Sequence, residues 1–151
     1  MKEHFPDIPT PAFKSTEQQR AVEMSLARQF NFVAVLPTGG GKSLLFTLPA
    51  LAERKQHPPP KTFVIVPNKA LLDDHLVKAR SVGLNAIQWS SVSKRLSDDE
   101  QLIFVALETA ASQGFMKLWS EQEGHVVRLV IDEAHQMLTQ RSFRDKFEKL
   151  S

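Results

Sequence analysis

Residues 37–43 (Pro37-Thr38-Gly39-Gly40-Gly41-Lys42-Ser43) carry the residue types that bind a phosphate chain, and they follow the apolar run 32–36. Three consecutive glycines leave the backbone without Cβ atoms, so successive N–H groups can converge on a phosphate where a helix begins. Lys42 supplies a positive charge for terminal phosphates, and the Ser43 hydroxyl can hold Mg²⁺. The segment therefore predicts one half of a nucleoside-triphosphate site.

The second half is Asp132-Glu133-Ala134-His135, which follows the apolar run 126–131. Asp132 stands where a strand gives way to a loop, a position from which a carboxylate can reach the same Mg²⁺. Glu133 can orient a water molecule. Each half alone has an ordinary explanation. Residues 37–43 could be a glycine-rich turn without a ligand, since Leu36 stands where the strict phosphate-loop pattern has its first glycine. Residues 132–135 could be a solvated acidic loop. Their order, and the apolar run before each, favour the nucleotide site.

Composition limits the alternatives. A chain of 151 residues suits one compact domain, and 42% apolar with 24% charged residues is typical of a soluble globular protein. The net charge of +2 permits a nucleic-acid partner without arguing for one. The absence of cysteine excludes disulfides and thiolate zinc sites, and the five histidines lack paired ligand spacing. With no leader-like N-terminus and no run of membrane-span length, we expect an intracellular protein without a membrane partner.

Alternating apolar and helix-compatible segments predict the fold class. Apolar runs rich in β-branched residues predict strands at 32–36, 62–66, 102–107 and 126–131, with 85–89 as a weaker fifth candidate. Their continuous apolar character is typical of strands covered on both faces. Helices are expected at 16–29, capped by Ser15 or Thr16, at 42–53, 69–82 and 108–121, and from 133 onward.

This order predicts an α/β fold with a mostly parallel sheet and helices on both faces. Ligands of such sheets gather at the carboxyl ends of the strands, where both motifs fall. Residues 1–12, with three prolines, are expected to form an extended lead-in. Residues 56–60 suggest a stiff connector, and residues 90–100 a surface loop or short helix.

Residues 37–43 together with 132–135 resemble the RecQ-like branch of the superfamily 2 DNA helicases, specifically their first RecA-like, DEAH-box domain. The resemblance implies a three-layer P-loop NTPase fold over residues 13–151. It also implies ATP and Mg²⁺ as cofactors, single-stranded or forked DNA as a partner, 3′–5′ unwinding by the parent enzyme, and roles in DNA repair and recombination. A eukaryotic member would be expected in the nucleus.

The resemblance also implies roles for individual residues. The residues expected to bind the nucleotide are Thr38, Gly39, Gly40, Gly41, Lys42, Ser43 and Leu44. Ser43 and Asp132 become the Mg²⁺ ligands. Glu133, Lys42 and His135 become the catalytic residues, with Glu133 positioning the attacking water and His135 relaying the nucleotide state.

A segment ahead of the first strand, residues 13–18, looks like the family element that holds adenine. Gln18 would bond the edge of the base, because an amide can donate and accept at once and so distinguish adenine from guanine. The spacing from Phe13 is one residue longer than the common pattern, so Gln19 remains an alternative. An exposed position in the first turn of a helix is the ordinary explanation for Gln18.

Two further segments are similar to DNA-side elements of the family. Pro67, Asn68 and Lys69 follow the 62–66 strand, and the helix start at Lys69 offers N–H groups to a phosphate of single-stranded DNA. Thr109, after the 102–107 strand, can bond another phosphate. The alternative is an ordinary helix start after a strand at residues 67–69, and a capped helix after a strand at Thr109.

The sequence also departs from the family. Residues 136–142 lack the tryptophan and histidine of the aromatic-rich loop that couples DNA to hydrolysis, and Phe143, Phe147 and Leu150 favour an amphipathic helix instead. Family enzymes need a second RecA-like domain whose arginine stabilises the transferring phosphoryl group, so we expect ATP–Mg²⁺ binding with little hydrolysis or unwinding. A non-catalytic nucleic-acid or partner-binding module is the alternative. A small-molecule kinase is disfavoured by the 132–135 motif.

Overall fold

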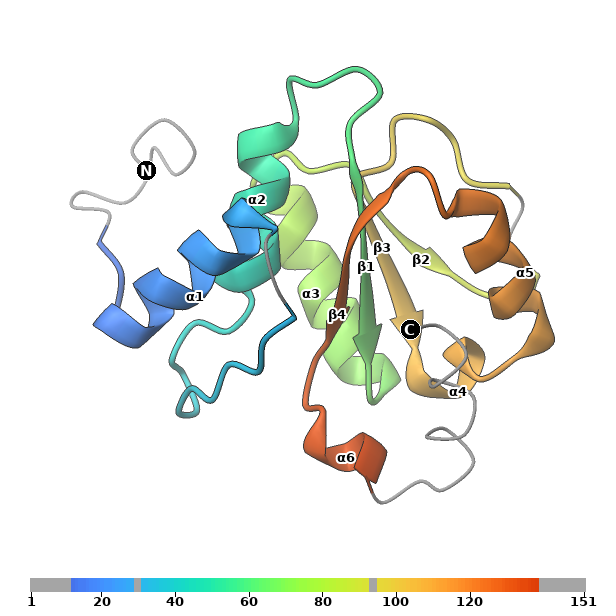
Figure 1. Ribbon diagram of the computed structural model, residues 1–151. Coiled ribbons are helices and arrows are strands. Elements are labelled where there is room, and N and C mark those ends of the chain that lie inside the picture. The colour runs from blue at the N-terminus through green and yellow to red at the C-terminus, as the bar shows by residue number, and fades with distance from the viewer. Residues whose placement is uncertain (1–11, 29–30, 93–94, 139–151) are drawn as a thin grey trace.

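The structure, a computed structural model, describes residues 12–28, 31–92 and 95–138 (Figure 1). Its centre is a sheet of four strands in the order β2-β3-β1-β4, and every neighbouring pair is parallel. The strands are β1 Lys61–Val66, β2 Ala86–Trp89, β3 Leu102–Ala106 and β4 Val126–Ile131. The α/β class with a mostly parallel sheet is therefore confirmed, including the weaker strand candidate at 85–89.

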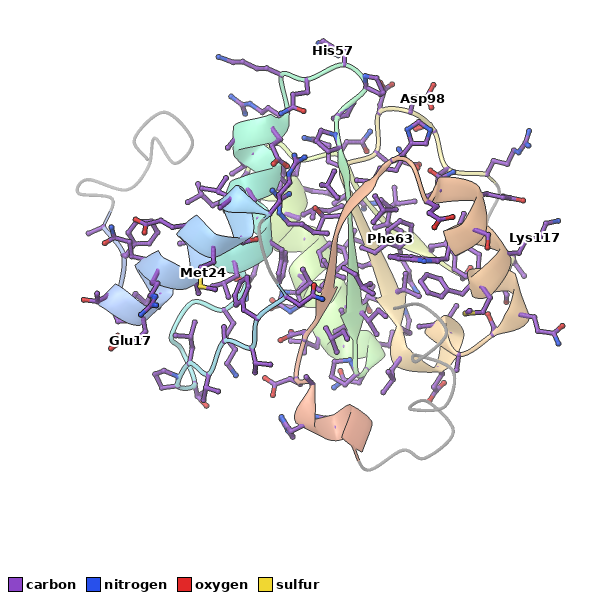
Figure 2. All side chains as sticks on the ribbon, viewed as in Figure 1. Glu17, Met24, His57, Phe63, Asp98 and Lys117 are labelled. Carbon is purple, nitrogen blue, oxygen red and sulfur yellow. The ribbon has the colours of Figure 1, made fainter. Side chains whose placement is uncertain are left out.

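Helices cover both faces of this sheet. All six residues of β1 are buried, and they alternate between two cores. Val64 and Val66 pack with residues of α2, Leu44–Glu53, and α3, Lys69–Ser81. Phe63 and Ile65 pack on the other face with residues of α4, Leu107–Ala110, and α5, Gln113–Gln122 (Figure 2). Burial of each such side chain stabilises the fold by about 1.5–3 kcal/mol. Because both faces of the strand are covered, its sequence is continuously apolar.

Helix α1, Thr16–Ala27, packs against α2. Ser15 is its cap, because its hydroxyl accepts a hydrogen bond from Gln18 N at 3.1 Å. The Ser25 hydroxyl donates to the Leu45 carbonyl at 2.8 Å and joins the two helices. The helix ends at Arg28, whose φ of 54° lies in the left-handed region. The helix expected at 16–29 is thus confirmed, and it ends earlier, at Ala27.

The predicted strand at 32–36 is wrong. This run joins no ladder, and Val33 and Val35 are 87% and 88% exposed, whereas Leu36 is buried. A strand gains its stability from a hydrogen-bonded neighbour. Within the described residues, β4 pairs only with β1 and forms one edge of the sheet, and the 32–36 run stays outside as a connection from α1 to α2 (Figure 1).

Other boundaries differ in detail. The helix expected at 42–53 begins at Leu44, and the one expected at 108–121 is divided into α4 and α5. The division lies at Ser112, whose hydroxyl accepts from Phe115 N and starts α5. The described part of 90–100 is a loop, held by Lys61 Nζ, which donates to the carbonyls of Ser97 and Glu100. No helix among the described residues is long and apolar enough to span a membrane.

At the end of the described chain, α6 (His135–Leu138) lies within the helix expected from residue 133 onward, and the remainder of that expected helix lies outside the described residues. Phe143, Phe147 and Leu150 lie outside the described residues, as do residues 1–11 of the expected lead-in.

Candidate functional site

The glycine segment forms a tight loop before α2. Gly40 N donates to the Pro37 carbonyl at 2.8 Å, and a Cβ atom on Gly40 would lie 2.8 Å from that same oxygen. Gly39 and Gly41 have φ of 74° and 75°, a region that other residues rarely adopt. A side chain at any of these three positions would therefore strain or block the turn.

The loop leads directly into the start of α2. The carbonyls of Gly41, Lys42 and Ser43 accept from Leu44 N, Leu45 N and Thr47 N at 3.0 Å each. Among the described residues, the N–H groups of Gly41, Lys42 and Ser43 have no hydrogen-bond partner. Free amides at the positive end of a helix form a site for an anion such as phosphate.

The acidic segment reaches the same place from β4. Asp132 N donates to the Ile65 carbonyl at 2.9 Å, which extends the β4–β1 ladder by one residue. The chain then turns at Glu133, whose φ is 51°. Lys42 Nζ lies 3.2 Å from Glu133 Oε1. The structure thus brings the two halves of the expected site together at the carboxyl ends of the strands.

Asp132 is held through both carboxylate oxygens. Its Oδ2 lies 2.9 Å from His75 Nε2, and its Oδ1 accepts from Glu133 N at 3.0 Å. Burial acts to raise the pKa of Asp132, but the hydrogen bond and charge of His75, the Glu133 N–H and the charge of Lys42 more than offset it. The pKa therefore lies below its ordinary value, and Asp132 is ionised at neutral pH.

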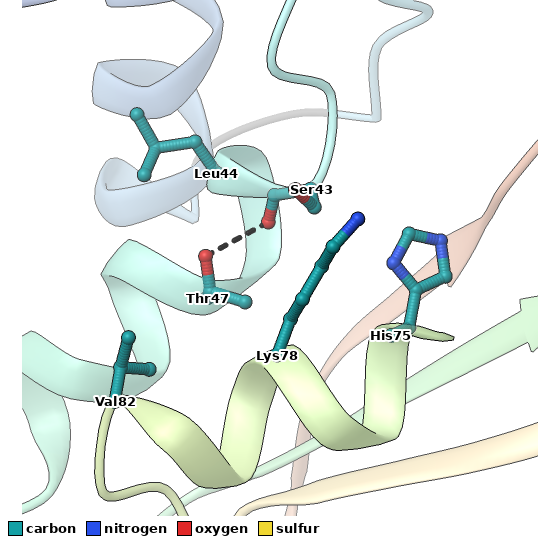
Figure 3. A pocket seen from close by; sticks show the side chains of 6 residues that line it. All are labelled: Ser43, Leu44, Thr47, His75, Lys78 and Val82. Carbon is teal, nitrogen blue, oxygen red and sulfur yellow. Dashed lines mark hydrogen bonds between the residues drawn. The ribbon is translucent and has the colours of Figure 1, made fainter. Parts of the chain in front are cut away.

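A small cavity of about 150 Å³ lies between α2 and α3 beside this pair (Figure 3). It is lined by Ser43, Leu44, Thr47, His75, Lys78 and Val82. The described residues contain no cluster of three or more acidic, histidine or cysteine side chains that could hold a metal alone. A hydroxyl and one carboxylate are hard oxygen donors, and Mg²⁺ commonly takes few protein ligands and completes its shell with phosphates and water. The residues therefore fit a nucleotide-bound Mg²⁺.

Gln18 lies against the glycine loop and is 2% exposed. Its Oε1 accepts from Lys14 N at 2.7 Å, and its Nε2 donates to the Gly41 carbonyl at 3.1 Å. Lys14 Nζ donates to the Gly39 carbonyl, so this element supports the loop from one side. The exposed alternative, Gln19, bonds Glu23 instead. Recognition of adenine by Gln18 stays a prediction, and the surface-exposed explanation is wrong.

The remaining residues expected in the nucleotide site adjoin the glycine loop or the Asp132-Glu133 pair in the sequence. Thr38 is exposed, Leu44 is half-buried, and His135 Nδ1 lies 3.4 Å from Glu133 Oε2 on an exposed ring. Asn68 caps α3, because its Oδ1 accepts from Leu71 N at 2.9 Å. An ordinary helix start after a strand, the alternative expected at residues 67–69, is thus present there.

The residues expected on the DNA side follow neighbouring strands. Pro67, Asn68 and Lys69 follow β1, and Thr109 follows β3, which pairs with β1. The Lys69 side chain is 73% exposed, with its Nζ 3.3 Å from Asp73 Oδ1. These residues therefore lie along the same edge of the sheet as the glycine loop.

Sequence reasoning missed one polar group in the site and one buried ion pair outside it. His75 lies in the buried stripe of α3 with Leu72 and Ala79, and a histidine at helical spacing within an apolar stripe was the available signal. Arg128 interrupts the apolar strand β4 and forms a buried ion pair with Glu53 of α2. Arg128 Nε also donates to the Ser25 carbonyl at 2.9 Å, so the pair links α1, α2 and β4.

Comparisons with known proteins agree with this geometry. The family model described as DEAD/DEAH box helicase matches residues 15–151. The chain is 31% identical over 133 residues to ATP-dependent DNA helicase Q1 of Rattus norvegicus, covering 78% of the chain and 20% of that relative. It is 29% identical over 147 residues to ATP-dependent DNA helicase RecQ of a Synechocystis strain, covering 88% and 29%. The chain thus spans less than a third of the length of these relatives.

Proposed function

The chain belongs to the DEAD/DEAH box helicase family, with RecQ-like DNA helicases as its relatives, and we propose that it is the ATP-binding domain of a RecQ-like ATP-dependent DNA helicase. In this proposal the chain binds ATP with Mg²⁺ and contacts single-stranded DNA. The observation that carries it is the approach of Lys42 Nζ to Glu133 Oε1 at 3.2 Å beside the free amides of the glycine loop.

Each residue has a task in this proposal. The amides of residues 41–43 and the Lys42 ammonium bind the phosphates, and Ser43 and Asp132 hold Mg²⁺. When bound, Mg²⁺ would neutralise charge on the phosphates. Glu133 now faces Lys42, so a phosphate that takes Lys42 releases the Glu133 carboxylate to orient a water. His135, beside Glu133 and exposed, is placed to sense that change.

DNA is assigned to residues at the same carboxyl-end edge of the sheet as the glycine loop. Lys69 adds an exposed positive charge where α3 begins, and Thr109 stands after the adjacent strand. Such groups bind the phosphate backbone without reading sequence. We assign ATP binding and DNA contact to these residues and expect slow hydrolysis without the arginine of a second RecA-like domain.

ATP binding in the presence of Mg²⁺, measured by calorimetry, tests the proposal. A hydrogen bond from a charged group contributes about 1.5–3 kcal/mol, so Lys42→Ala should weaken ATP binding roughly 10- to 100-fold. Lys117→Ala is the matched control, because this lysine lies on the outer side of α5, exposed and far from the loop (Figure 2). Unchanged ATP binding by Lys42→Ala would show that the proposal is wrong.

The DNA contact has a separate test. Single-stranded DNA binding should weaken as salt rises, and Lys69→Ala should reduce the slope of that dependence by about one. DNA affinity in a chain that binds no ATP would favour the non-catalytic module instead.

A further inference from the structure

We propose that His75 is a positioning residue that fixes the orientation of the Asp132 carboxylate for binding of Mg²⁺ with the nucleotide. The inference rests on the proposed function, since it concerns the Mg²⁺ ligand of the same site. Its basis is the geometry around the His75 ring, which lies on α3 and reaches Asp132 at the end of β4.

The ring is held in one orientation by its neighbours. His75 is 8% exposed, and its ring is stacked on Phe104 with 5.9 Å between centroids and an interplanar angle of 6°. Phe46 meets it edge-on, at 5.5 Å and 83°. Aromatic pairs of these geometries are favourable, and a rotated ring would lose both contacts. His75 therefore presents Nε2 to Asp132 as a fixed feature of the fold.

The hydrogen bonding shows which group donates. Nε2 lies 2.9 Å from Asp132 Oδ2, and Nδ1 is buried with no hydrogen-bond partner among the residues that the structure describes. An ionised carboxylate only accepts a hydrogen bond, so Nε2 carries a proton and donates it to Oδ2 of Asp132.

The second oxygen of Asp132 completes the arrangement. Oδ1 accepts from Glu133 N at 3.0 Å, so one bond to each oxygen fixes the plane of the carboxylate. His75 and Ser43, the other proposed Mg²⁺ ligand, line the same cavity (Figure 3). Groups that hydrogen-bond to a metal ligand and orient it, without binding the metal themselves, typically contribute about 10- to 100-fold in metal affinity. We therefore expect His75 to act on Mg²⁺ binding without touching the metal.

Two substitutions separate hydrogen bonding from packing. His75→Phe keeps a ring between Phe46 and Phe104 but removes the donor, whereas His75→Gln loses the ring and keeps an N–H group of similar reach. Binding of a fluorescent ATP analogue is measured over a range of Mg²⁺ concentrations at fixed pH, and again in EDTA. His75→Phe should need about 10- to 100-fold more Mg²⁺ for half-maximal binding. Its binding in EDTA should match the parent, and His75→Gln should recover most of the Mg²⁺ response.

The outcomes separate this inference from the proposed function. If the parent chain binds no ATP with Mg²⁺, the proposed function fails and this inference fails with it. If the parent binds and His75→Phe keeps the parental Mg²⁺ dependence, or His75→Gln is impaired equally, only the role of His75 is overturned. If His75→Phe does not fold, nitrogen NMR of the metal-free parent decides: a proton on Nε2 of His75 is expected, and a proton on Nδ1 alone overturns the inference.

Discussion

Lys42 Nζ and Glu133 Oε1 lie 3.2 Å apart although 91 residues separate them in the sequence. Their side chains are 38% and 28% exposed, so solvent screens the pair and limits its contribution to at most about 1 kcal/mol. A phosphate that enters the glycine loop can therefore displace Glu133 from Lys42 at little cost.

Replacing Glu133 with Gln tests this competition. Glu133→Gln removes the carboxylate that faces Lys42 and its repulsion of phosphates, so ATP affinity should equal or exceed that of the parent. Hydrolysis, where measurable, should fall by about 10²–10⁴-fold because the carboxylate proposed to orient water is lost. Calorimetry and phosphate release measure the two effects. Glu121→Gln, at an exposed position on α5, should change neither. Weaker ATP binding by Glu133→Gln would contradict the competition.

Gly41 is a position where a side chain should both strain the backbone and disturb a contact of the glycine loop. Its φ is 75°, and a Cβ atom there would collide with Nε2 of Gln18. Gly41→Ala should lower the free energy of unfolding by about 1–3 kcal/mol through strain and should also weaken ATP binding through displacement of the loop. Chemical denaturation and ATP titration measure both.

Gly83→Ala is the matched control for Gly41→Ala. Gly83 has a φ of 84°, but a Cβ atom there meets nothing within 4 Å. It should show the loss of stability from backbone strain alone, with ATP binding unchanged. Equal ATP binding by the two variants would show that the contact between Gln18 and Gly41 does not shape the loop.

Most of the strands and the glycine turn were predictable because their signals are local. β1 is buried on both faces, so its apolar run correctly predicted a strand, and the three glycines predicted a tight turn before α2. The run at 32–36 is also continuously apolar, yet whether it forms a strand depends on whether a neighbouring strand is available, which composition does not encode. His75 was missed for a related reason, because its partner Asp132 is 57 residues away. Contacts that only the tertiary fold brings about could not be predicted from the sequence.

Threonine substitutions test the placement of the 32–36 run. Val33 and Val35 are exposed, so Val33→Thr and Val35→Thr should change the free energy of unfolding by less than about 0.5 kcal/mol. Val64 in β1 is 0% exposed, and Val64→Thr should cost about 1–3 kcal/mol because its hydroxyl is buried without a partner. Urea denaturation measures all three. A loss at Val33 or Val35 as large as that at Val64 would place the run inside the sheet.

The buried ion pair of Glu53 and Arg128 makes stability depend on pH. Arg128 donates to both Glu53 oxygens, and Arg28 donates to Oε1 at 3.1 Å. Burial acts to raise the pKa of Glu53, but the hydrogen bonds and charges of Arg128 and Arg28 more than offset it, so the pKa lies below its ordinary 4.5. The unfolded chain therefore takes up the proton first. The stability from this group is complete above about pH 4.5 and is lost as pH falls through the folded pKa.

Glu53→Gln should therefore lower the free energy of unfolding by about 3–5 kcal/mol at pH 7, because Arg128, with a side chain 6% exposed, keeps a buried charge without its partner. Arg28 is 35% exposed and can turn to solvent, so Arg28→Ala should cost far less. Urea denaturation at several pH values measures both, with Glu23→Gln as an exposed control on α1. The difference between Glu53→Gln and the parent should shrink as pH falls below 4.5. A difference that stays constant with pH would mean that the charge of Glu53 does not stabilise the fold.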